Sequence, residues 1–187
     1  MLPKLELKIS GPYNHILSDD FNYREYMADA DKCIENFNKN FNKFKKRTTS
    51  FQKAFIKKQK IILKLIEKYS GYDWKGKSIP IYLINITQKP SIADPLTLKF
   101  RDNLDSMFIL LIHELTHLNL PQKMQFDAGN KRSEQWVNLI TRYVALELKL
   151  DLNKATMKNF SEALELEWNL KNKTLKKFIQ PNASPKS

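Results

Sequence analysis

The segment RDNLDSMFILLIHELTHLNLP, residues 101–121, constrains the fold of this chain more than any other. Its apolar run at 107–112 covers every side of a helix, so such a helix must be buried all round. Asp102 or Asn103 can cap the start of this helix, and Pro121 prevents it from continuing far. We therefore expect a central buried helix with the other elements packed around it.

Three segments have the patterns of β-strands. Near the N-terminus, apolar and polar residues alternate over 5–10, which predicts a strand with one buried face. The sequence IPIYLINI at 79–86 is apolar on both faces and predicts a central strand. Residues 96–101 alternate again, which predicts a strand with one solvated face at the edge of the sheet. A small sheet of about three strands follows.

Four further segments have the apolar spacing of helices. Residues 19–46 and 51–69 show it most clearly, and Ser50 is a suitable N-cap between them. Two more helices are predicted downstream, over about 132–150 and 161–178. The expected fold class is therefore α+β and mainly helical, with helices added at both ends of the chain.

Composition narrows the chemistry that the chain can perform. Its single cysteine, Cys33, excludes an intrachain disulfide and any CxxC zinc or redox site. Only three histidines are present, so few residues can bind a transition metal. No apolar run resembles a signal peptide or is long enough to span a bilayer, so we expect a soluble, cytoplasmic protein with no membrane partner.

The chain is strongly basic, with 32 Lys and Arg against 20 Asp and Glu, a net charge of +12. Most of the excess is lysine, whereas proteins that read phosphates or bases rely more on arginine. One side of the helix expected at 51–69 carries a stripe of Lys53, Lys57, Lys60, Lys64 and Lys68. A solvated face explains this stripe, and weak polyanion binding through it is the alternative.

The chemical signal is the sequence His113-Glu114-Leu115-Thr116-His117 within the buried helix. Positions i and i+4 differ by about 40° around a helix, so both imidazoles project from one face. Two imidazole nitrogens can then bind one Zn²⁺ ion. Glu114 lies roughly 60° further round, where its carboxylate can contact an attacking water. The alternative is a pair of buried histidines that bind carboxylates or backbone groups only.

This segment resembles the zincin metallopeptidases. The resemblance is specific at His113, Glu114 and His117, and it extends loosely over 78–150, where strands and helices follow the zincin order. It implies a zinc-dependent peptidase fold, with the edge strand near 97–101 lining the cleft for a peptide or protein substrate. The metzincin branch is excluded, because LNLPQK after His117 contains neither the glycine nor the histidine of that pattern.

A catalytic zinc needs a third protein ligand. Resemblance to the gluzincins implies Glu134, in SEQWVN at the start of the next helix, with Asn138 one turn later as a hydrogen-bond partner of His113 or His117. The spacing from His117 is short for that group, and Ser133 stands where many members have asparagine. Asp127 and His15 are the other candidate ligands. Glu134 also borders the polar face of its helix, where a solvated glutamate would be ordinary.

The small size of the chain resembles the minigluzincins among the gluzincins. We expect a single zincin-like domain over 1–179 with long additions at both ends of the metallopeptidase core. The core at 78–150 follows an N-terminal strand and helices at 1–70, and a C-terminal helical addition at 151–179 comes after it. Residues 180–187 (QPNASPKS) are expected to form a flexible tail.

The resemblance implies hydrolysis of peptide bonds by a water that Zn²⁺ and Glu114 activate together. Arg142 and Tyr82 are both candidates for the oxyanion donor, whereas Tyr143 should face away, about 180° round the helix from Glu134. One alternative is a latent or inactive zincin-fold binding module. The other is a nucleic-acid-associated protein whose basic surface binds polyanions.

Overall fold

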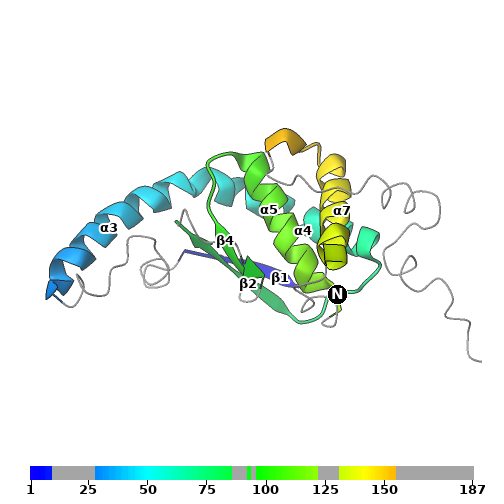
Figure 1. The fold of residues 1–187 in the computed structure, drawn as a ribbon, viewed down its shortest axis with the longest axis horizontal. Helices are drawn as coiled ribbons and strands as arrows, with labels where there is room; N and C mark the ends of the chain where they lie inside the picture. Colours follow the sequence, from blue (N-terminus) through cyan, green and yellow to red (C-terminus); the bar gives the residue numbers. More distant parts are fainter. Residues whose placement is uncertain (10–27, 86–91, 94–95, 122–130, 155–187) are drawn as a thin grey trace, which may run out of the picture.

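The computed structural model describes residues 1–9, 28–85, 92–93, 96–121 and 131–154. These residues form a mainly helical α+β fold with a small sheet, which confirms the expected fold class (Figure 1). The elements in chain order are β1 (Lys4–Lys8), α3 (Ala30–Arg47), α4 (Thr49–Ser70), β2 (Ser78–Ile84), β3 (Ile92–Ala93), β4 (Leu96–Lys99), α5 (Leu104–Asn119), α7 (Lys131–Glu147) and a 3₁₀ turn η1 (Leu152–Lys154).

The sheet has the strand order β1-β2-β4-β3. β1, β2 and β4 are parallel, with Leu5 opposite Ile79 and Tyr82 opposite Thr97. Parallel strands need a long crossover connection, and α3 and α4 lie in the connection between β1 and β2. The position of β2 between two strands confirms the central strand predicted from its apolar sequence.

The strand expected at the sheet edge is an inner strand. The short strand β3 pairs antiparallel with the outer side of β4, with Ile92 opposite Thr97 and Ala93 opposite Leu96. Thr97 is only 1% exposed, so the predicted solvated face is also wrong. The alternation of apolar and polar residues along β4 reflects side-chain polarity only. The burial of Thr97 depends instead on the strands that lie on either side of β4. An edge strand does lie beside α5, but it is β3.

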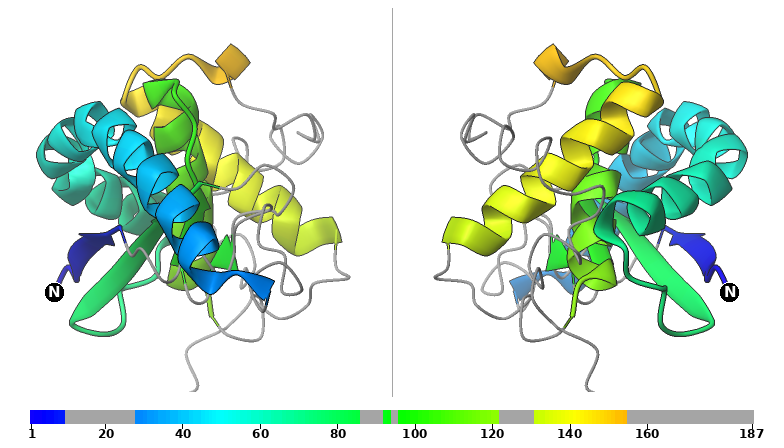
Figure 2. Two further views of the ribbon diagram at one scale, coloured as in Figure 1. Left: turned by 90° about the vertical axis from the view of Figure 1, so that its left-hand side faces the viewer. Right: turned by 90° about the vertical axis from the view of Figure 1, so that its right-hand side faces the viewer.

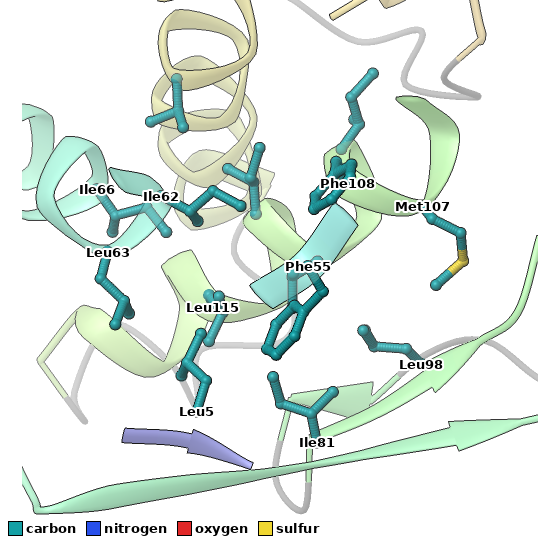
Figure 3. Close-up of a cluster of buried hydrophobic side chains, with 14 of the residues drawn as sticks. Leu5, Phe55, Ile62, Leu63, Ile66, Ile81, Leu98, Met107, Phe108 and Leu115 are labelled. Carbon is teal, nitrogen blue, oxygen red and sulfur yellow. The ribbon is translucent and has the colours of Figure 1, made fainter. Parts of the chain in front are cut away.

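Three helices, α4, α5 and α7, pack against one another over the sheet (Figures 1 and 2). The core between these helices and the sheet is drawn in Figure 3, where Leu5 and Ile81 of the sheet face Leu115 and Phe55 of the helices. In the run 107–112 of α5, every residue except the half-buried Leu110 is at most 1% exposed. The prediction of a central buried helix is therefore confirmed.

Capping residues explain where α5 begins and ends. The backbone N–H of Ser106 donates to Asn103 Oδ1 over 2.9 Å, so Asn103 is the N-cap. Asp102, the other candidate, instead accepts hydrogen bonds from the guanidinium of Arg47 at 3.0 and 2.7 Å. The helix ends at Asn119, before Leu120 and the helix-breaking Pro121.

The boundary between α3 and α4 is at Thr48, not at Ser50. Thr48 has helical angles (φ −74°, ψ −10°), so α3 runs into α4 with almost no break, and Ser50 lies in the first turn of α4. α4 ends at Gly71, whose φ of 76° is the left-handed conformation that glycine adopts at low cost. Figure 1 shows the start of α3 extending well beyond the sheet.

Several predictions concern residues outside the described ranges. These are the start of the helix expected at 19–46, the helix expected at 161–178 and the tail at 180–187. The helix expected at about 132–150 is α7, which ends at Glu147 just before Lys149, a residue with a left-handed φ of 55°. None of the described helices has the length and apolar character needed to cross a bilayer.

Candidate metal centre

The helix α5 places both histidines of the HExxH sequence on one face. Nε2 of His113 lies 3.2 Å from Nε2 of His117, and the two rings meet edge to face with their centroids 4.8 Å apart. Their side chains are 18% and 17% exposed. The two nitrogens therefore converge at the margin of the core, as the i, i+4 spacing predicts.

The third group comes from α7, which packs along α5 through residues such as Val137 and Ile140. This packing brings Glu134 Oε1 to 3.2 Å from Nε2 of His117 and Glu134 Oε2 to 3.7 Å from Nε2 of His113. One ligand atom from each of the three residues lies within 4.8 Å of the others. The structure thus brings together the three residues suggested as ligands.

The two other candidates for the third ligand, Asp127 and His15, lie outside the described residues. Glu147, the glutamate at the far end of α7, does not approach the histidines. Its Oε1 accepts hydrogen bonds from Lys68 Nζ at 2.6 Å and from the Tyr69 hydroxyl at 2.7 Å. Glu147 therefore joins α7 to α4, a contact that the sequence analysis did not predict.

The spacing of the groups can be compared with that of a tetrahedral metal site. Ligand atoms at 2.0–2.1 Å from a zinc ion, separated by the tetrahedral angle, lie about 3.3 Å from one another. The two imidazole nitrogens are 3.2 Å apart, and His117 Nε2 is 3.2 Å from Glu134 Oε1, which is close to this value. His113 Nε2 lies farther from the carboxylate, 3.7 Å from Oε2, and one ligand atom from each residue lies within 4.8 Å of the others. Two imidazoles and one carboxylate are also a known donor set of catalytic zinc.

The protonation states suit metal binding as well. Burial and, next, the neighbouring His117 lower the pKa of His113 to about 4, so the ring of His113 is neutral near pH 7. A hydrogen bond with His117 holds the pKa of Glu134 below its usual value, which keeps this group a carboxylate. Metals bind neutral imidazole and ionised carboxylate, so no proton has to leave His113 or Glu134 first.

Glu114 is the buried acid beside this centre. It is 7% exposed, and its pKa is raised to about 7, mainly by burial, with His117 opposing the shift and the charge of Glu134 adding to it. A carboxyl group with this pKa can both accept and release a proton near neutral pH.

The hydrogen-bond partners of the histidines are partly as expected. The side chain of Asn138, one turn after Glu134 on α7, is near enough to His113 to raise its pKa against the effect of burial. Nδ1 of His113 is buried and has no hydrogen-bond partner within the described part of the chain. A histidine that binds metal through Nε2 usually donates from Nδ1 to an outer hydrogen-bond partner.

The three candidate oxyanion donors lie in different places. Tyr143 stacks on Tyr69 of α4, with ring centroids 5.3 Å apart, and so faces away from Glu134 as expected. Tyr82 lies on β2, where the ammonium of Lys8 in β1 is 5.7 Å from its ring centroid. Arg142 is half-buried on α7, two turns after Glu134. Its position keeps it on the same side of α7 as Glu134 and Asn138.

No family model, curated protein or solved structure matches the chain. The side chains themselves therefore carry the functional evidence. They bring together three residues that could hold a metal ion, with the Glu134 side chain 55% exposed and the buried carboxyl group of Glu114 next to His113 in sequence.

Proposed function

We propose that this protein is a zinc-dependent metallopeptidase in which His113, His117 and Glu134 bind Zn²⁺ and Glu114 is the general base. The observation that supports this most is the convergence of the three side chains, which come from two separate helices, with one potential ligand atom of each within 4.8 Å of the others. The resemblance of the HExxH sequence to the gluzincins agrees with this ligand set and suggests a peptide substrate.

The chain's own residues supply the remaining chemistry. Zinc, when bound, polarises a carbonyl group and makes water more acidic. The carboxylate of Glu114 accepts the proton of the attacking water and then transfers it to the leaving amine. Burial of Glu114 limits competing contact with bulk solvent, and the exposed side of Glu134 leaves a route by which a peptide reaches the centre.

The first test compares Glu114→Gln with the wild type. The variant should retain one zinc per chain, because Glu114 is not a ligand, and its hydrolysis of a mixed-sequence peptide library should fall by about 10²- to 10⁴-fold. Zinc is measured by elemental analysis and cleavage by mass spectrometry. Glu67→Gln, on α4, is the control: it makes the same change of charge outside the centre and should keep both properties.

Three results would contradict the proposal. A purified protein that neither contains zinc nor takes it up has no metal centre of this kind. Equal cleavage by the wild type and Glu114→Gln would exclude Glu114 as the base. A wild type that binds zinc at one equivalent but cleaves no peptide would instead be a latent or inactive zinc-binding module.

A further inference from the structure

The positive charge of this chain is concentrated in α3 and α4. Residues 30–70 contain twelve Lys and Arg against three Asp and Glu, a net of +9 out of the +12 of the whole chain. The five lysines 53, 57, 60, 64 and 68 are all exposed. They lie within about 80° of arc on α4 and extend over about 22 Å of its length.

The opposite side of α4 is buried in the core. Phe51, Phe55, Ile62 and Ile66 are at most 3% exposed, and they pack against α5, α7 and the sheet. The lysine stripe, defined as the five lysines above, therefore points away from the elements that carry His113 and Glu134. A function of the stripe does not depend on the proposed metal centre.

Little nearby charge neutralises the stripe. Lys68 Nζ lies 2.6 Å from Glu147, and among the described residues no ion pair involves the other four lysines. Four neighbouring ammonium groups on a rigid helix repel one another, and a polyanion relieves this repulsion while releasing its own counterions. Charge complementarity thus indicates a partner with closely spaced negative charges.

The surroundings of the stripe favour duplex nucleic acid among polyanionic partners. A helix that lies in a membrane surface inserts its apolar face, but the apolar face of α4 is occupied by the core. Single-stranded nucleic acid is bound by stacking on aromatic side chains, and among the side chains of α4 the only exposed large apolar ones are Ile56 and Ile61. Duplex phosphates, at one charge per about 1.7 Å of axis, require neither feature.

We propose that the lysine stripe of α4 binds the phosphate backbone of double-stranded nucleic acid without sequence preference. Lysine contacts a phosphate as a point charge and reads no base edge, so the affinity is electrostatic. The four lysines without a carboxylate partner predict a slope of about −3.6 for the logarithm of the binding constant against the logarithm of salt concentration.

The test is fluorescence anisotropy of the full chain with a labelled mixed-sequence DNA duplex in about 50 mM salt. The triple variant Lys57→Glu, Lys60→Glu, Lys64→Glu should weaken binding at least about 100-fold, because each lost phosphate contact costs about tenfold at this salt concentration. The matched control is Lys75→Glu, Lys77→Glu, Lys154→Glu, which changes the net charge equally at exposed positions outside α4. Circular dichroism checks that both variants fold.

The proposal expects the control triple to bind far better than the stripe triple, and the duplex to bind better than a single strand of the same sequence. Equal weakening in both triples would show that only net charge matters and would overturn it. It is also overturned if the wild type does not bind the duplex, if the salt slope is shallower than about −1, or if phosphatidylserine vesicles bind more tightly than the duplex.

Discussion

Glu134 provides one carboxylate oxygen to each imidazole of α5, at 3.2 and 3.7 Å. At the residue scale, this arrangement is the basis of the proposal that Glu134 is a metal ligand. Glu134→Gln should lower zinc affinity by more than about 100-fold, since a lost ligand costs more than the roughly 10- to 100-fold of a lost outer hydrogen-bond partner. Competition with a chelating dye measures the affinity. Glu147→Gln, the matched change on the same helix, should leave zinc affinity unaltered, and equal affinities for the two variants would exclude Glu134 as a ligand.

At the scale of the element, α4 has two faces that differ in burial but share residue types. Ile62 is fully buried and Ile56 is 68% exposed. Ile62→Ala should lower the free energy of unfolding by about 2–5 kcal/mol, because it leaves a cavity between α4 and its neighbours. Ile56→Ala removes the same atoms from a solvated site and should change the free energy of unfolding by no more than about 0.5 kcal/mol. Urea denaturation measures both, and similar losses would contradict the orientation of α4.

At the scale of the whole molecule, the proposed metal joins α5 to α7. An ion that binds only the folded chain adds about 4 kcal/mol of stability at a thousandfold excess over its Kd. Chelation near pH 7 should then lower Tm by about 8–16 °C in a chain of this size. The loss should shrink in acid, where protons compete with the metal for the ligands. Differential scanning fluorimetry with and without chelator tests this, and a Tm that chelation leaves unchanged would contradict it.

The predictions from sequence succeeded where local pattern determines structure. The buried helix α5 followed from an apolar run with a cap and a proline, and its two histidines share a face because of helical geometry. The outward lysines of α4 followed from the same periodicity. The predictions from sequence failed at contacts between elements. The inner position of β4 depends on its pairing with β3, which the alternation of apolar and polar residues in β4 does not encode. The break expected at residues 48–50 is present at Thr48, but Ser50 is not the cap, because it already lies in the first turn of α4.

By itself, the sequence determined the main helices and the three parallel strands, and which side of each helix is apolar, because both depend on neighbours a few residues apart. It also determined that a metal bound by two imidazoles must use two of only three histidines, of which His113 and His117 share a helix. Only the tertiary structure decided that Glu134 faces those histidines while Glu147 turns to Lys68 and Tyr69 of α4. The reason is physical: the rotation of α7 about its axis is set by how its apolar residues pack against α4 and α5, which are distant in sequence.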